Sequence, residues 1–277
     1  MIGKENEAKN DTMQWHEGTE STKPNLKLNP SWTFGKFVVG SSNMMAFNAA
    51  KAVSSKPGAL YNPLYIYGAS GLGKTHLMHA IGHHFSTTMP GRIDVIDSEV
   101  FTNDYIWALQ NRELPIFRRY HRSAEVLIID DVHFFAGKER MQEELRHTFD
   151  ALHSARKQIV VFANQPPSHI AGLNTELANR FESGLCVDIQ QPDLKLRSAI
   201  LKNKLADMKI TLSAEFVTYI ATSIPVNPRR LEGALIRATS YQSLAGEKLT
   251  LPTLKKILED LTEQGAPKEG EIGMARA

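Results

Sequence analysis

The sequence lacks most of the features that mark secreted and membrane proteins. It holds one cysteine, Cys186, among 277 residues, so no disulfide can form within the chain, which favours a reducing compartment. No apolar run approaches the length of a membrane span, and the first residues include no apolar signal core. The formal net charge is only +2, which permits contact with nucleic acid but does not predict it. We therefore expect a globular, cytoplasmic protein.

The clearest pattern that is present is a phosphate-binding loop. Residues 68–75 read G-x-x-x-x-G-K-T, directly after a β-prone run at 64–67 and directly before a helical apolar pattern. Glycines allow several backbone N–H groups to point at one anion, Lys74 adds a positive charge, and the hydroxyl of Thr75 can bind a metal ion. The residues that we expect around the bound phosphates are Gly68, Ala69, Ser70, Gly71, Leu72, Gly73, Lys74, Thr75 and His76.

Two later apolar strands end in polar side chains. The strand that starts at residue 124 ends in Asp130 and Asp131, and the strand at 158–163 is followed by Asn164. Because Mg²⁺ prefers oxygen ligands, we assign Asp130 and Thr75 to the metal, and Asp131 to the attacking water as a general base or an electrostatic orienter. Paired acids at a strand end are weak evidence alone, and their position after a phosphate-binding loop strengthens it.

The order of expected elements predicts an α/β fold with a helical domain behind it. Strands and helices alternate up to about residue 191, which is typical of about five parallel strands flanked by helices, with the ligand at their carboxyl ends. From residue 193 the apolar pattern is helical throughout, with helices expected at 194–208, 213–223, 229–244 and 251–261. We expect a disordered tail at 1–28, a nucleotide-binding domain at 29–191, a helical lid domain at 192–262 and a flexible tail at 263–277.

The helix after the phosphate-binding loop is rich in histidine. His79 and His83 have the i, i+4 spacing of a metal-binding pair. No cysteine or well-placed carboxylate completes a metal site, so we interpret these histidines as structural.

Assembled in order, these motifs resemble an AAA+ ATPase and, within that class, the DnaA family of bacterial chromosomal replication initiators. The matching segments are residues 33–40 (TFGKFVVG), 61–68 (YNPLYIYG), 71–82 (GLGKTHLMHAIG), 134–140 (FFAGKER) and 230–235 (RLEGAL). The resemblance covers roughly residues 28–261. Members of the family continue into a helix-turn-helix domain that reads duplex DNA, and the present sequence has no counterpart of it.

The resemblance implies ATP or ADP with Mg²⁺ as cofactors and a role for each matching residue. Lys74 and Thr75 would hold the β- and γ-phosphates and Mg²⁺, with Asp130 and Asp131 at the metal and the water. Asn164 would be the first sensor of the γ-phosphate and Arg229 the second. Val39, Gly40 and Asn43 lie where the family surrounds the adenine. Arg180 matches the arginine finger, which in this family reaches the ATP of a neighbouring subunit.

The resemblance also implies that the chain binds single-stranded DNA through Ile106, Lys138 and Arg140. The two cations would neutralise phosphates, and Ile106 would pack on a sugar or base. One departure concerns the subunit interface. Family members usually carry arginine four residues before the finger, and this sequence has Glu176, which reverses the charge there.

These features favour one function over two others. The leading hypothesis is an ATP-binding, slowly hydrolysing module of an initiator that self-associates in the ATP state and engages single-stranded origin DNA. The alternative is a regulatory paralogue that docks on the initiator and stimulates its hydrolysis through Arg180. A helicase loader, also AAA+, fits the initiator-like segments less well.

Overall fold

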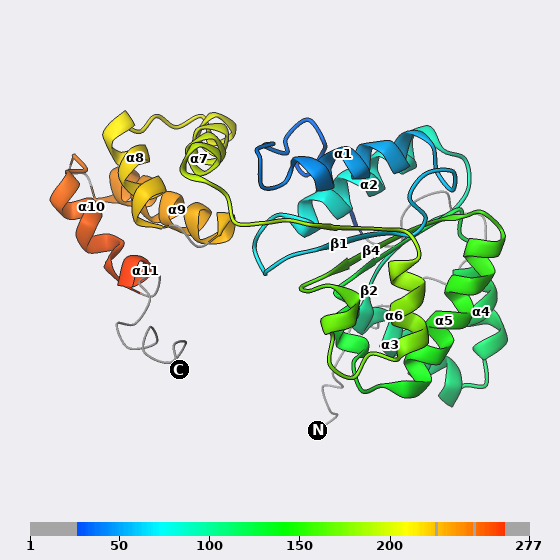
Figure 1. Cartoon of the computed structure of the whole chain (residues 1–277). Coiled ribbons are helices and arrows are strands. Elements are labelled where there is room, and N and C mark those ends of the chain that lie inside the picture. Colours follow the sequence, from blue (N-terminus) through cyan, green and yellow to red (C-terminus); the bar gives the residue numbers. More distant parts are fainter. Residues whose placement is uncertain (1–26, 225–226, 246–247, 264–277) are drawn as a thin grey trace, which may run out of the picture.

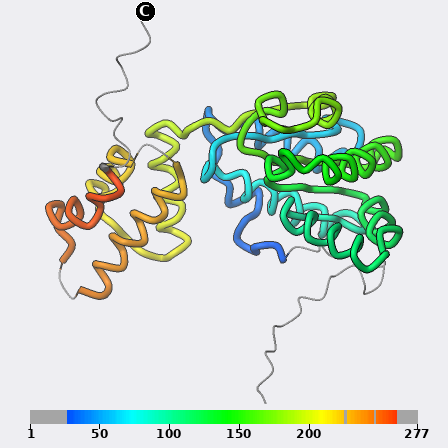
Figure 2. Tube along the Cα trace, turned by 90° about the horizontal axis from the view of Figure 1, so that it is seen from below, coloured from blue at the N-terminus to red at the C-terminus, as the bar shows by residue number. Residues whose placement is uncertain are grey.

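The computed structural model describes residues 27–224, 227–245 and 248–263 (Figure 1). The tails expected at 1–28 and 263–277 lie almost wholly outside the described residues. An α/β domain and a helical domain lie side by side, as the view from below in Figure 2 also shows.

The α/β domain is built on one parallel sheet of five strands in the order β2-β3-β4-β1-β5. The strands are β1 (Leu64–Tyr67), β2 (Ile93–Asp97), β3 (Val126–Asp130), β4 (Gln158–Ala163) and β5 (Leu185–Asp188). Nearly continuous apolar runs fit strands that are buried on both faces. Their register places Asp97 beside Asp130 and Tyr67 beside Ala163, so the carboxyl ends of β1 to β4 share one edge. The predicted α/β fold is confirmed.

Helices cover both faces of the sheet. α1 (Met44–Ser55) and α2 (Lys74–Thr88) pack on one face with their own apolar core. The other face carries α3 (Ser98–Gln110), α4 (Leu114–Arg122), α5 (Glu139–Ser154) and α6 (Thr175–Glu182), together with the short 3-10 turns η2 (Val132–Phe135) and η3 (Pro167–His169). The sheet is therefore the middle layer of three.

The helical domain has a separate core. Its elements are α7 (Leu194–Met208), α8 (Ala214–Ser223), α9 (Pro228–Leu244), α10 (Leu251–Ile257) and α11 (Glu259–Glu263). The prediction of a single helix at 251–261 is wrong, because the helix is interrupted at Leu258. The backbone of Leu258 (φ −109°, ψ 2°) leaves the helical region, while its side chain stays buried. Figure 1 shows the chain passing from β5 straight into α7, which places this domain at the carboxyl edge of the sheet.

Candidate nucleotide-binding site

The loop between β1 and α2 forms the cradle that its motif predicts. Gly71 and Gly73 both have left-handed backbone, with φ of 81° and 103°. Gly73 is the N-cap of α2 and offers no side chain, so the first N–H groups of the helix face the loop without a side-chain cap. Such an open helix N-terminus is suited to an anion.

Lys74 lies within this cradle and is only 7% exposed. Its Nζ donates to the carbonyl oxygens of Gly68 at 2.7 Å and Ala69 at 3.1 Å. Burial lowers the pKa of Lys74, and the carboxylates of Asp130 and Asp131 oppose that shift. The ammonium has three donors, so one remains to bind an anion.

The acidic end of β3 lies against the start of α2. The hydroxyl of Thr75 is 3.5 Å from Oδ2 of Asp130, and Oδ1 of Asp130 accepts from the N–H of Asp131 at 2.8 Å. Burial first, and then the neighbouring Asp131, raise the pKa of Asp130 to about 6. A cation bound here would offset both the burial of the Asp130 carboxylate and its repulsion by Asp131. A hydroxyl together with a carboxylate is a set of ligands that fits Mg²⁺. Asn164 follows β4 directly and is exposed.

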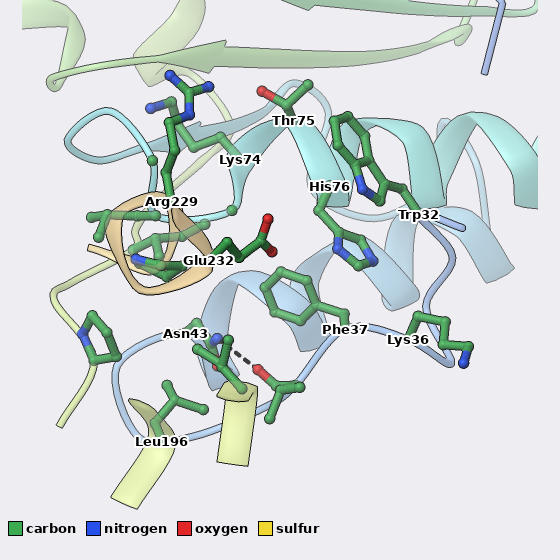
Figure 3. Close-up of a pocket in the computed structure, with 18 of the residues that line it drawn as sticks. Trp32, Lys36, Phe37, Asn43, Lys74, Thr75, His76, Leu196, Arg229 and Glu232 are labelled. Carbon is green, nitrogen blue, oxygen red and sulfur yellow. Dashed lines mark hydrogen bonds between the residues drawn. The ribbon is translucent and has the colours of Figure 1, made fainter. Parts of the chain in front are cut away.

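These groups open into a pocket of about 360 Å³ whose walls come mainly from three parts of the chain (Figure 3). One wall is an N-terminal arm, defined here as residues 29–43, the second is the loop with the start of α2, and the third is the helical domain. The lining residues outside the loop include Trp32, Lys36, Phe37, Val38, Asn43, Asp131, Ile189, Leu196, Ile200, Asn203, Lys204, Asp207, Arg229 and Glu232.

The arm reaches the pocket in a way that differs in detail from the sequence prediction. Val38, and not Val39, lines the pocket, and the side chain of Val39 is 40% exposed. Asn43 lines the pocket and also folds the arm, because its Oδ1 accepts from the N–H of Gly40 at 2.8 Å and its Nδ2 donates to the carbonyl of Val38 at 3.0 Å. Gly40 packs so closely on Leu196 that a Cβ there would come within 2.8 Å of it.

Histidines of α2 hold the arm in place. The Nε2 of His76 bonds the carbonyl of Thr33 at 2.9 Å, the Nε2 of His83 bonds the carbonyl of Asn29 at 2.7 Å, and Nδ1 of His79 accepts from the Asn29 N–H at 3.0 Å. No cluster of metal ligands is found among the described residues. Burial, and then the neighbouring His83 and His76, lower the pKa of His79 to about 4. These contacts agree with the structural interpretation of the histidines.

The helical domain contributes Arg229 and Glu232 from the first turns of α9 (Figure 3). Pro228 occupies the first turn, where its missing N–H costs nothing, and Asn227 caps the helix by accepting from the N–H of Arg230. Glu232 is paired with Lys204 of α7 at 3.4 Å. The same helix α7 reaches the arm through the ion pair of Asp207 with Lys36.

The residues predicted as the arginine finger and the DNA contacts lie on other helices and do not line this pocket. Arg180 of α6 binds Asp150 of α5, with Nε 2.9 Å from Oδ1. Ile106 of α3, and Lys138 and Arg140 at the start of α5, are exposed.

Several lining residues were not predicted from the sequence. Trp32 and Phe37 pack around His76, with ring centroids 6.2 and 5.2 Å away, and their place in an aromatic-rich segment was the one available signal. Asn203, Lys204 and Asp207 carried no signal, because polar residues on an amphipathic helix usually face water.

A phosphate cradle at the head of α2, an acid at the end of β3 and a helical domain that walls the pocket define an AAA+ P-loop module. Residues 28–188 match the family model described as the bacterial DnaA ATPase domain, and the chain belongs to this family. Chromosomal replication initiator protein DnaA of Thermus thermophilus is 48% identical over 249 residues, and that of Aliarcobacter butzleri is 43% identical over 259. These matches cover 90% and 94% of this chain but 56% and 59% of the two relatives, so the chain spans somewhat more than half of their length.

Solved structures agree with the family assignment. Domain III of the Thermotoga maritima replication initiation protein DnaA matches with a TM-score of 0.82 at 37% identity, covering 86% of this chain and all of that one. A replication initiator DnaA bound to AMPPCP and single-stranded DNA matches with a TM-score of 0.74 at 32% identity, covering 86% of this chain and 70% of that one. Every helix among the described residues is too short or too polar to cross a bilayer.

Proposed function

We propose that this chain binds ATP with Mg²⁺, assembles into oligomers in the ATP state and hydrolyses ATP slowly as a replication-initiator module. The observation that carries this proposal is the position of Arg180. Its side chain is half-exposed and lies on α6, outside the pocket of its own chain. An arginine in this position is suited to a nucleotide held by a neighbouring subunit.

Within one subunit the pocket supplies the groups that hold the nucleotide. Lys74 and the first N–H groups of α2 would hold the β- and γ-phosphates, and Thr75 with Asp130 would hold the metal. Mg²⁺, when bound, neutralises charge on the phosphate oxygens. Asp131 would orient the attacking water, Asn164 and Arg229 would respond to the γ-phosphate, and the arm would surround the base.

Slow hydrolysis follows from the separation of these groups. A single subunit lacks the cation that Arg180 would supply to the transition state, because Arg180 is held by Asp150 outside the pocket. In P-loop enzymes an arginine supplied from a partner raises the rate by roughly 10³–10⁵. Turnover should therefore depend on assembly, so that ATP acts chiefly as an assembly ligand.

The assembled module would engage single-stranded origin DNA through Ile106, Lys138 and Arg140. Support comes from the relative whose structure is described with AMPPCP and single-stranded DNA. The cations neutralise backbone phosphates, and the exposed Ile106 packs on a sugar or base.

The test is sizing by light scattering with Mg²⁺–ATP and with Mg²⁺–ADP, alongside binding of a labelled single strand. We expect oligomers and DNA binding with ATP only. Lys74→Ala should abolish both by removing nucleotide binding, and Arg180→Ala should bind ATP normally yet hydrolyse it much more slowly. A monomer at high concentration with ATP, together with no DNA binding, would reject the proposal.

A second candidate is a regulator that docks on a full-length initiator and stimulates its hydrolysis. Glu176 favours it, because it places a carboxylate where the resemblance implies an arginine of the subunit interface. Adding the chain to a full-length initiator and measuring ATP turnover separates the two candidates. Stimulation that disappears with Arg180→Ala supports the regulator, and no stimulation rejects it.

A further inference from the structure

Four side chains of alternating charge lie in a row across α5 and α6. Glu176 and Arg180 are one turn apart on α6, and Arg146 and Asp150 have the same spacing on α5. The Nε of Arg146 lies 3.4 Å from Oε2 of Glu176, and its Nη1 lies 3.3 Å from Oδ2 of Asp150. The other carboxylate oxygen of Asp150, Oδ1, lies 2.9 Å from Nε of Arg180. We call this row the α5–α6 charge chain.

The two helices that carry the charge chain are fixed to each other by buried contacts. Gln142 of α5 is 2% exposed and donates to the carbonyls of Phe135 at 2.9 Å and Gly172 at 2.8 Å, while its oxygen accepts from the N–H of Asn174. Asn174 in turn caps α6. Phe181 is buried on the inner side of α6 and packs on Phe149 of α5. Asp150 therefore has a defined position relative to Arg180.

The contact with Asp150 leaves the phosphate-binding part of Arg180 available. A guanidinium has five N–H donors, and its two Nη groups form the fork that binds phosphate in a bidentate manner. Asp150 forms an ion pair with Arg180 on the Nε side of the guanidinium, and among the described residues Arg180 makes no other ion pair and no side-chain hydrogen bond. An arginine held through Nε loses fewer conformations when its fork binds, because its direction is already set.

We propose that Asp150 is a positioning residue for Arg180. The carboxylate of Asp150 holds the Nε side of the Arg180 guanidinium, so that the Nη fork points toward the nucleotide of a neighbouring subunit. Arg146 fixes Asp150, and Glu176 balances the charge of Arg146. The carboxylate of Glu176, which reverses the charge usual in the family, thus pairs with Arg146 of its own subunit. This inference rests on the proposed function of Arg180 in trans.

Asp150→Ala in the full chain tests the inference through steady-state ATP hydrolysis under assembling conditions. We expect kcat to fall by roughly two- to fivefold, the size that suits a half-exposed ion pair, with KM for ATP unchanged because Asp150 lies outside the pocket. Asp150→Asn, which keeps an acceptor oxygen, should recover part of the loss. Glu143→Ala is the matched control, since Glu143 is an exposed carboxylate on the same helix, 3.7 Å from His147. Light scattering should show equal assembly for all variants.

A double-mutant cycle makes the test specific. In an Arg180→Ala background, Asp150→Ala should have no further effect, because the side chain that it positions is gone. Equal losses in both backgrounds would overturn the inference, and so would an unchanged or raised kcat for Asp150→Ala alone. Unchanged turnover in Arg180→Ala would overturn the trans role and this inference together. A large loss in Arg180→Ala with none in Asp150→Ala would overturn this inference and leave the proposed function standing.

Discussion

The backbone N–H of Asn29 donates to Nδ1 of His79 across 3.0 Å, so this ring must present an unprotonated nitrogen to the N-terminal arm. The ring is 6% exposed, and it stands edge-on to Trp32 with centroids 4.8 Å apart. A proton on Nδ1 would break the hydrogen bond and place a charge in a buried site. The arm that forms one wall of the nucleotide pocket is therefore tied to the neutral form of one histidine.

This relationship predicts a pH dependence of stability. The pKa of His79 is lowered to about 4 in the folded chain, against about 6.5 when unfolded. Above pH 6.5 both states are neutral, and below it the unfolded chain takes up the proton first. The free energy of unfolding should fall as pH drops from about 6.5 to 4, by up to about 3 kcal/mol from this residue.

Urea unfolding at several pH values, with His79→Asn for comparison, measures this contribution. Asparagine keeps an acceptor near the position of Nδ1 and cannot titrate, so the variant should lose less stability over that range. His169→Asn, at an exposed histidine of η3, is the control and should follow the wild type. Parallel curves for His79→Asn and wild type would contradict the assignment.

Gly71→Ala should weaken nucleotide binding through the helical domain. A Cβ at Gly71 would lie 3.0 Å from Cγ of Asn227 and 3.2 Å from Cβ of Arg229, so the start of α9 would have to move. Gly137 also has left-handed backbone, and a Cβ there meets nothing within 4 Å. Both alanine variants should lose about 1 kcal/mol of stability from backbone strain, and only Gly71→Ala should raise the Kd for ATP, by about tenfold or more. Calorimetric titration measures this, and equal Kd values would contradict it.

Arg229 and Arg230 form a natural pair for testing the second sensor. Arg229 lines the pocket, whereas its neighbour Arg230 does not. Arg229→Ala should reduce the preference for ATP over ADP by roughly tenfold, the effect expected for a lost charge-assisted contact with the γ-phosphate. Arg230→Ala should keep the preference of the wild type. Competition binding with a fluorescent nucleotide gives both ratios, and an equal effect of the two changes would argue against a sensor at Arg229.

The DNA prediction is best tested through salt dependence. If Lys138 and Arg140 each contact one phosphate, removing either cation should lower the slope of log Kobs against log salt by about 0.7 for single-stranded DNA. Ile106→Ala should weaken binding without changing that slope. Lys202→Ala, an exposed lysine of α7, serves as the control. A slope that stays constant in Lys138→Ala and Arg140→Ala would remove both residues from the DNA interface.

Local patterns predicted the sheet and the cradle because their determinants are close together in sequence. The strand at 64–67, the glycines and Lys74 follow one another directly, and the polar residues at the ends of β3 and β4 follow apolar runs. The family resemblance, including its reach across both domains, agreed with the comparisons. The roles of individual site residues stay predictions.

Contacts between distant segments could not be predicted in this way. Asp207 faces the arm residue Lys36, and nothing in the helical pattern of 194–208 separates this carboxylate from one that faces water. The sequence likewise presented Glu176 as an unmatched charge reversal. Its contact with Arg146 depends on the packing of α6 on α5, which periodicity alone does not specify.

The ion pair between Lys36 and Asp207 bears on how long a ligand stays. It joins the arm to α7 at the rim of the pocket, beside the hydrogen bond from Asn203 to the carbonyl of Lys36. Separation of the arm from α7 would widen the exit for a ligand in this pocket. Residence time would then depend on a partly exposed pair that touches no phosphate, and moderate ionic strength would shorten it by screening that pair. The rate at which the bound ligand exchanges would thus depend on the contact between the arm and α7, whereas the affinity for phosphate would depend on the phosphate-binding loop. The two properties could then change independently.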